Sequence, residues 1–343
     1  MEKQFKHFGY MVFFAVAAFA LTFFAGCSKP AFDVYVAGYE ELENGQSIAV
    51  FWKNGEKTVL FDNHGWATCV AVQGPDVYVA GLETAEQGLL KAFYWKNGER
   101  NIIFDGDNST WASHVAVSGS DVYISGRQIR PDGKITAVFW KNGEKTALSD
   151  GSFSSMANAL VVTGSAVYIG GNDLNGEPEG SKAVYWKNGE RTVLSGNSGN
   201  AGVTAMAVSG NDVYVAGSED AEAVFWKNGH KTVLTDGMAS SVTSVTSIDV
   251  SGSNVYTVGH EINDGKTVAV YWKNRAKTIL SENSSMANSV TVKGSDVFIA
   301  GRETDSERVT SAVYWKNGEK VTLTRGPGVV SSNANDIFLV PKK

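Results

Sequence analysis

Two tryptophans and the polar residues near them offer the most chemistry in this sequence. Trp66 and Trp111 are accompanied along the chain by His64, His114 and Arg127. Indole rings stack on sugars or peptide groups, while imidazole and guanidinium groups supply the few polar contacts that orient such a ligand. We therefore predict a ligand-binding aromatic shelf at these five residues.

The same tryptophans also admit a purely structural interpretation. They fill equivalent positions in neighbouring copies of a repeat, and Met156 and Met286 fill that position in two other copies. A hydrophobic plug over a central channel would use the same residue types, so packing stays open as the alternative. Tyr39 and Arg302 begin two variable loops at the same predicted end, and we add them to the candidate ligand-binding residues.

Catalytic and metal-binding motifs are sparse. The chain has no Gly-x-Ser-x-Gly elbow, no His-Glu-x-x-His and no phosphate-cradling loop. Acidic loop residues could converge as a general acid and base, as in glycoside cleavage, so a polysaccharide hydrolase or lyase stays as an alternative function. The candidates for that role are Glu83, Asp132, Glu261 and Asp305. Segments 105–108 and 173–177 contain only pieces of calcium loops, and we predict no metal and no cofactor.

A repeat must position these residues. A segment of the type Asp-Val-Tyr-Val-Ala-Gly starts at Asp33 and returns six times at intervals of 42 to 46 residues. Each copy continues into an aromatic strand that ends in Trp-Lys-Asn, and seven of the nine tryptophans occupy this position. A period of this length built from short β-type segments is typical of propeller blades. The later copies start at Asp76, Asp121, Ala166, Asp212, Asn254 and Asp296.

Each copy supplies four strand candidates, and Asn-Gly between the second and third of them predicts a two-residue type I′ hairpin. The sixth copy has Asn274-Arg275 instead, so we expect its hairpin to be the least regular. The first copy lacks an inner strand, which segment 333–340 can supply. We therefore predict an all-β fold: a seven-bladed β-propeller of four-stranded antiparallel blades, closed by the carboxyl-terminal strand joining the first blade.

In outline the unit resembles a Kelch-type blade, because a Val-Tyr-Val strand that ends in glycine leads through a loop to an aromatic strand. The Gly-Gly doublet of Kelch repeats occurs only as Gly170-Gly171, and the signatures of WD repeats are absent. The unit is equally similar to uncharacterised bacterial repeat propellers. This resemblance implies an architecture and no activity, since many unrelated functions share the fold.

The amino terminus is typical of an export signal, because Lys3 and Lys6 precede an apolar run that ends in Phe24-Ala25-Gly26-Cys27. That ending resembles the lipobox of bacterial lipoproteins, although Phe24 departs from the usual leucine. An uncleaved anchor or an ordinary secretory signal is the alternative. We predict a signal peptide at 1–26, lipidated Cys27 and a short tether at 27–32, and the propeller at 33–343. Cys69 is then unpaired and is expected to be a small buried residue.

Charge and loop variety suggest how the domain is used. The formal net charge of −6 makes nucleic acid an improbable partner. Variable loops emerge at one end, the top, where acidic residues predominate, while the Lys-Asn-Gly hairpins make the other end basic and suited to face anionic headgroups. We expect a monomeric, lipid-anchored binding or scaffold module of the bacterial cell envelope, at the outer membrane, that holds a protein or glycan partner. A structural spacer is a further alternative.

Overall fold

The computed structural model describes residues 31–85, 88–103, 106, 108–174, 180–196, 199–235 and 244–342. The signal segment and Cys27 lie outside these residues, as do the loop at 236–243 and parts of the segments 105–108 and 173–177. Residues Phe32–Lys343 form one compact unit. Within the described ranges, no helix has the length and apolarity needed to cross a membrane.

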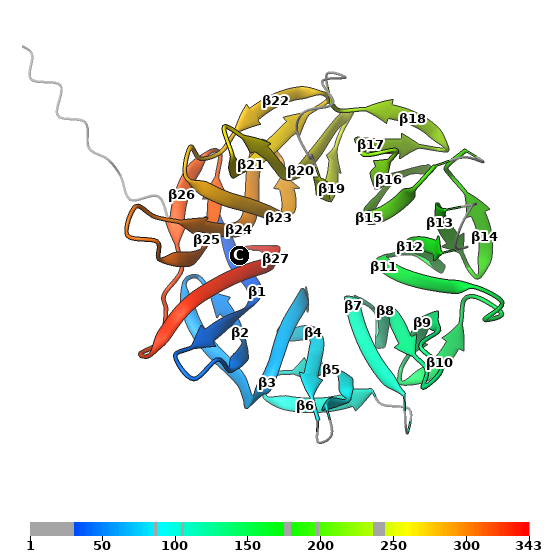
Figure 1. The fold of residues 1–343 in the computed structure, drawn as a ribbon, viewed down its shortest axis with the longest axis horizontal. Helices are drawn as coiled ribbons and strands as arrows, with labels where there is room; N and C mark the ends of the chain where they lie inside the picture. Colours follow the sequence, from blue (N-terminus) through cyan, green and yellow to red (C-terminus); the bar gives the residue numbers. More distant parts are fainter. Residues whose placement is uncertain are drawn as a thin grey trace, which may run out of the picture. The chain divides into compact units, whose positions relative to one another are not determined.

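The unit is all-β, and its sheets surround a central space (Figure 1). Four sheets have four antiparallel strands each. Their strands are β7 (Ser109–Ser118), β8 (Asp121–Ile129), β9 (Ile135–Lys141) and β10 (Glu144–Ala147); β11 (Ser154–Thr163), β12 (Ala166–Leu174), β13 (Ser181–Lys187) and β14 (Glu190–Val193); β15 (Ala201–Ser209), β16 (Asp212–Glu219), β17 (Glu222–Lys227) and β18 (His230–Val233); β19 (Ser244–Ser251), β20 (Asn254–Asn263), β21 (Lys266–Lys273) and β22 (Ala276–Ile279).

The fifth sheet has 11 strands and contains both ends of the repeat array. Its last strand, β27, pairs antiparallel with β1, so that Leu339 faces Val34 and Ile337 faces Val36. The strands of this sheet are β1 (Phe32–Leu42), β2 (Ser47–Lys53), β3 (Glu56–Gln73), β4 (Asp76–Thr84), β5 (Leu90–Lys96), β6 (Glu99–Ile103), β23 (Ser284–Lys293), β24 (Asp296–Thr304), β25 (Thr310–Lys316), β26 (Glu319–Thr322) and β27 (Val329–Pro341).

The prediction of a closed propeller with seven separate four-stranded blades is therefore wrong. Two connections merge what should have been separate sheets. Strand β3 runs unbroken for 18 residues and pairs with β2 through its first part and with β4 through its second. In addition, Thr310 of β25 and Ser331 of β27 form a parallel bridge. The connecting segment of β3 is itself extended, so it carries hydrogen-bonded pairing from one repeat to the next.

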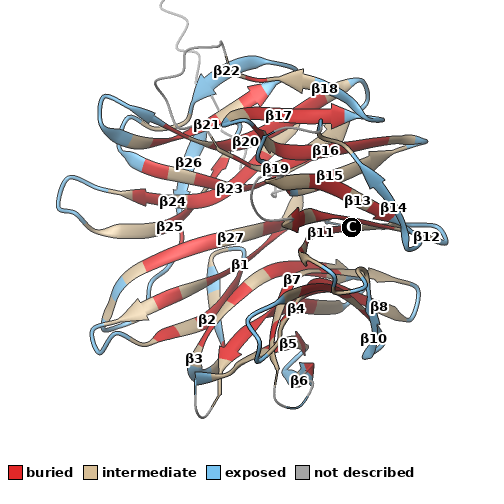
Figure 2. Ribbon diagram, turned by 45° about the vertical axis from the view of Figure 1, so that its right-hand side comes forward, coloured by how far each residue is buried: buried red, intermediate tan, exposed pale blue. Residues whose placement is uncertain are grey.

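The repeat tryptophans pack the interior, as their regular recurrence predicts. Trp52, Trp186, Trp226, Trp272 and Trp315 are among the largest fully buried side chains. The outer strands β10, β14, β22 and β26 are exposed along their length, as the pale blue of β22 in Figure 2 illustrates. Cys69 is unpaired and buried, as expected.

The Asn-Gly hairpins behave as predicted. Their asparagines have φ between 47° and 52°, and the glycines that follow have φ between 84° and 104°. Arg275 takes the glycine position at φ 140°, so the sixth hairpin is the exception. The asparagine also ties the hairpin to the second strand: Asn97 Oδ1 accepts a hydrogen bond from the Val77 amide at 2.9 Å, and Asn97 Nδ2 donates to Asp76 at 2.7 Å.

A β-bulge interrupts each inner strand, where one residue has no partner on the second strand. The bulge requires a glycine opposite, because a Cβ on Gly126 would overlap the carbonyl oxygen of Trp111. The glycine that ends each Val-Tyr-Val-Ala-Gly motif has this function. The bulged residues, which we call the bulge ring, are Thr68, Ser113, Asn158, Thr204, Thr246, Asn288 and Asn335.

All members of the bulge ring are polar, and most of them bond to the inner strand of the next repeat. Thr204 Oγ1 donates to the Val245 carbonyl at 2.8 Å, and Thr246 Oγ1 donates to the Ala287 carbonyl at 2.6 Å. Asn335 Nδ2 donates to the Ala67 carbonyl at 2.7 Å, which connects the last strand of the chain to the second repeat. These side chains satisfy carbonyls that the bulges remove from the strand ladders.

Candidate functional site

The residues two positions before the bulged residues form a ring at the end of the sheets where the candidate residues lie. Each is paired in register with a second-strand residue that follows the motif glycine. We call these seven pairs the rim: Asn333 with Tyr39, Trp66 with Leu82, Trp111 with Arg127, Met156 with Asn172, Gly202 with Ser218, Ser244 with His260, and Met286 with Arg302.

Three of the predicted residues form one aromatic cluster on the rim. The Trp66 ring lies 4.6 Å from His64 and 6.4 Å from Tyr39, measured between centroids, and both contacts are edge-to-face. His64 Nδ1 accepts a hydrogen bond from the Ser47 amide at 3.0 Å, which fixes the imidazole. Burial raises the pKa of Tyr39, while the charge and hydrogen bond of Arg302 oppose this shift. Arg302 therefore borders the cluster.

Trp111 and Arg127 form a second cluster. The guanidinium carbon of Arg127 lies 4.2 Å from the centroid of the Trp111 ring, a cation–π contact, and its Nη1 lies 3.6 Å from the sulfur of Met156. Burial lowers the pKa of Arg127. Within the described part of the chain, no carboxylate lies within salt-bridge distance of Arg127. Among these residues Trp66 and Trp111 make no ring contact with each other, so the predicted shelf consists of two clusters.

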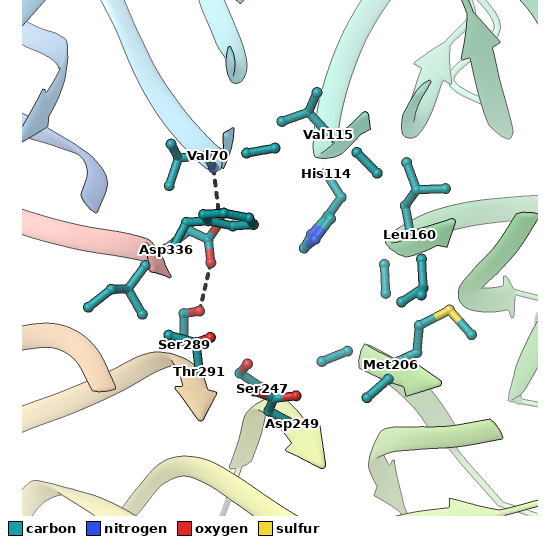
Figure 3. A pocket seen from close by; sticks show the side chains of 18 of the residues that line it. Val70, His114, Val115, Leu160, Met206, Ser247, Asp249, Ser289, Thr291 and Asp336 are labelled. Carbon is teal, nitrogen blue, oxygen red and sulfur yellow. Dashed lines mark hydrogen bonds between the residues drawn. The ribbon is translucent and has the colours of Figure 1, made fainter. Parts of the chain in front are cut away.

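His114 is separated from the other candidates. It lines a central cavity of about 510 Å³, in which its side chain lies near Asp336 (Figure 3). Burial lowers the pKa of His114, and the Asp336 carboxylate partly offsets this shift. Asp336 accepts hydrogen bonds from the Val70 amide at 2.9 Å and from the Ser289 hydroxyl at 2.6 Å. His114 is thus a cavity residue and takes no part in the rim.

A second, smaller cavity lies beside Arg302. Its volume is about 330 Å³, and six Ser and Thr side chains line it together with Glu41, Met286 and Arg302. Glu41 accepts a hydrogen bond from the Ser331 hydroxyl at 2.5 Å. An Nη atom of Arg302 lies 2.9 Å from the Met286 sulfur. Hydroxyl groups dominate this lining, which suits a polar ligand.

The acidic residues considered for catalysis are held within single repeats. Glu83 pairs with Arg100 at 2.7 Å, and Glu261 pairs with Lys277 at 3.0 Å. These pairs recur at equivalent positions, as in Lys57 with Glu40 (2.6 Å), Arg191 with Asp173, Lys231 with Glu219 (2.9 Å) and Lys320 with Glu303 (2.5 Å). Asp305 accepts bonds from two amides of its own loop, while Asp132 pairs with Arg130.

The same pairs weaken the predicted division into an acidic top and a basic bottom. In six of the seven repeats, the second basic residue of the hairpin segment pairs with a carboxylate at the acidic end of the second strand. The first basic residue, such as Lys96, pairs with Asp76 and lies over the Tyr78 ring at 5.1 Å. Much of the charge at both ends is therefore neutralised within each repeat.

Sequence reasoning missed two features of the site. His260 occupies the rim beside Arg302, and its Nδ1 is buried with no partner among the described residues. Burial lowers the pKa of His260, and the charge of Arg302 lowers it further. The bulge ring was also missed, although a polar residue recurs at that position in every repeat. No group of three or more metal-ligating side chains occurs within the described ranges.

The comparisons support the fold alone. No family model matches the chain, and no curated protein matches its sequence. One similar structure is a prolyl endopeptidase, with 14% identity, a TM-score of 0.53, and coverage of 85% of this chain and 50% of that one. Another is an acylaminoacyl peptidase of Pyrococcus horikoshii, with 12% identity, a TM-score of 0.53, and coverage of 88% and 52%. The chain spans about half the length of these proteins. Its fold is all-β and β-propeller-like.

Proposed function

We propose that this protein is a binding module that holds a protein or glycan partner on one arc of its rim. The arc runs from Arg302 through Tyr39 and Trp66 to Trp111 and Arg127, and we call it the aromatic arc. The observation that carries the proposal is the difference between this arc and the rest of the rim. None of the three rim pairs outside the arc contains tryptophan, tyrosine or arginine, since these pairs are Met156 with Asn172, Gly202 with Ser218, and Ser244 with His260.

The arc has the composition of a recognition surface. Its aromatic residues are half-buried, so part of each ring is available for contact, and aromatic and arginine side chains provide most of the binding energy in known interfaces. A polysaccharide hydrolase or lyase has less support, because Glu83 and Glu261 are engaged by basic residues of their own repeats.

Crosslinking in intact cells followed by purification of the chain tests this function. We expect one specific partner to be recovered with the native chain and lost from a Trp66→Ala, Trp111→Ala double variant. Tyr185→Ala is the matched control, because Tyr185 is a half-buried aromatic residue of β13 outside the rim. Equal recovery of the partner with the native chain and with the double variant would show that the aromatic arc does not bind this partner.

The proposal includes anchoring at the bacterial outer membrane through a lipid on Cys27. The tether 28–32 would reach roughly 17 Å when extended, so the domain would remain close to the bilayer. Metabolic labelling with a radioactive fatty acid tests the anchor. We expect label in the native chain and none in a Cys27→Ser variant, which should also leave the membrane fraction.

A further inference from the structure

We propose that the aromatic arc binds a carboxylated glycan, with a sugar carboxylate bound by Arg127 and hydroxyl groups bound in the cavity beside Arg302. This inference rests on the proposed function and names the class of its ligand. It predicts a chemical preference that binding by the arc does not by itself require.

The first step concerns the unbalanced charge of Arg127. The side chain is half-buried and stacked on Trp111, so it has lost part of its hydration without gaining a carboxylate among the described residues. Two arginines of the outer strands, by contrast, are compensated, because Arg100 pairs with Glu83 and Arg191 pairs with Asp173. A partly buried cation is stabilised by an opposite charge, and an external carboxylate would supply it.

The second step concerns the geometry of the guanidinium group. The Trp111 ring lies against the guanidinium group, whose N–H groups that are not directed at the Met156 sulfur can donate hydrogen bonds in the plane. A planar fork of donors matches the two oxygens of a carboxylate, and such pairs are shorter and stronger than neutral hydrogen bonds. Arginine occurs at this position in only two of the seven repeats, as Arg127 and Arg302, while other repeats have residues such as Leu82 and Ser218.

The third step favours a glycan over an acidic peptide. The cavity at the other end of the arc is lined by six Ser and Thr side chains, and it holds both Arg302 and Glu41. Such a lining suits a ligand rich in hydroxyl groups, and its volume of about 330 Å³ lies within the range of small-ligand sites. Between the ends, Tyr39 and Trp66 provide aromatic surface on which sugar rings can stack.

The test compares two forms of one polymer. The full chain, purified in detergent, is titrated with polygalacturonate and with its methyl-esterified form, which has the same backbone without the charge. Alginate and hyaluronate extend the carboxylated set, while dextran and polyglutamate represent neutral sugars and acidic peptides. We expect at least one carboxylated glycan to bind at least tenfold more tightly than the methyl ester, dextran and polyglutamate.

Variants assign that preference to Arg127. Arg127→Gln should abolish the tenfold difference in affinity. Arg127→Lys should retain part of this difference, because lysine keeps the charge but lacks the planar fork of donors. Arg130→Gln is the matched control, since Arg130 lies near the same end of β8 but pairs with Asp132. Thermal unfolding of each variant establishes that it is folded.

The remaining outcomes overturn the inference in distinguishable ways. The charged and esterified polymers could bind equally, and the Trp66→Ala, Trp111→Ala variant could bind neither. The arc would then still be a binding site, but it would not recognise the carboxylate. Tightest binding to polyglutamate would replace the glycan with an acidic peptide. If none of these polymers bound, the inference of a glycan ligand would be refuted, while the crosslinking experiment would still test the proposed function.

Discussion

Replacing Gly217 by alanine should destabilise the domain far more than a methyl group usually does. Gly217 faces the bulge of β15, and a Cβ there would overlap the carbonyl oxygen of Gly202 and lie 2.9 Å from its carbonyl carbon and 3.0 Å from the Cα of Val203. All three neighbouring atoms belong to the backbone, so no side-chain rotation relieves the contact.

The magnitude follows from two effects. Carbon and oxygen atoms in close contact lie about 3.3 Å apart. To relieve the overlap with the Gly202 carbonyl oxygen, the inner strand must therefore move by roughly 1 Å or more, and overpacking of this kind costs about 1 to 3 kcal/mol. Moving the strand also strains the bulge at Thr204, whose hydroxyl donates to the Val245 carbonyl at 2.8 Å. Loss of that bond would add about 1 kcal/mol. We expect Gly217→Ala to lower the free energy of unfolding by about 2 to 4 kcal/mol.

Urea unfolding monitored by tryptophan fluorescence measures this loss, and Gly196→Ala provides the control. Gly196 has ordinary φ, and its Cβ would meet only Glu219 Oε1 at 3.9 Å, so we expect a change within about 0.5 kcal/mol. Partner binding should survive in Gly217→Ala under native conditions, because Gly202 and Ser218 lie outside the aromatic arc. If both alanine variants unfolded at the same urea concentration, the proposed role of the motif glycines in accommodating the bulges would be refuted.

Three further predictions concern the hairpins, the pH response and the bulge ring. Arg275→Gly should stabilise the domain by about 1 kcal/mol in urea unfolding, because φ 140° is strained for a residue with a Cβ, and no gain would show that this turn carries no strain. Burial alone would raise the pKa of Glu303, but hydrogen bonds from Lys320, Ser281 and Asn283 hold this pKa below 4.5. The Glu303 carboxylate therefore contributes its full stabilisation above pH 4.5, and this stabilisation is lost as the pH falls through the lower pKa of the folded state. Glu303→Gln should flatten this acid limb of a stability-against-pH curve, and an unchanged limb would contradict the assignment. Asn335→Ala should cost about 1 to 2 kcal/mol by leaving the Ala67 carbonyl without its donor, which thermal unfolding can detect against a Ser253→Ala control in an exposed turn.

The local repeat structure was accessible from the sequence because its signals are local. The Asn-Gly turns and the exceptional Arg275 depend on residues adjacent in the chain, and the burial of the tryptophans follows from their recurrence once in every repeat. The number of sheets was not accessible, because it depends on whether the connection within Glu56–Gln73 breaks hydrogen bonding. That segment stays extended, with Phe61 packed against Phe93 at 4.8 Å and His64 bonded to the Ser47 amide. Those contacts join residues far apart in the chain.

The candidate site was predicted in part for the same reason. Trp66, His64 and Tyr39 do meet, and so do Trp111 and Arg127, because pairing register brings them to the rim. His114 lies only three residues beyond Trp111, but the strand carries it past the bulge into the central cavity. Proximity in sequence therefore placed His114 on the rim, although the bulge at Ser113 separates it from the rim.

The regularity of the repeats is what makes the site recognisable. Six repeats place a carboxylate on the second strand and pair it with a basic residue of the outer strand, whereas the third repeat has Gln128, which accepts a hydrogen bond from Lys145 at 3.4 Å. A charge that recurs with its partner in successive repeats serves the fold. Arginine at the Arg127 position and tryptophan at the Trp111 position each occur in only two of the seven repeats, and only the third repeat has both. Arg127 also has no carboxylate partner among the described residues. Two departures in contact with each other are the arrangement expected of a binding site rather than of a packing unit.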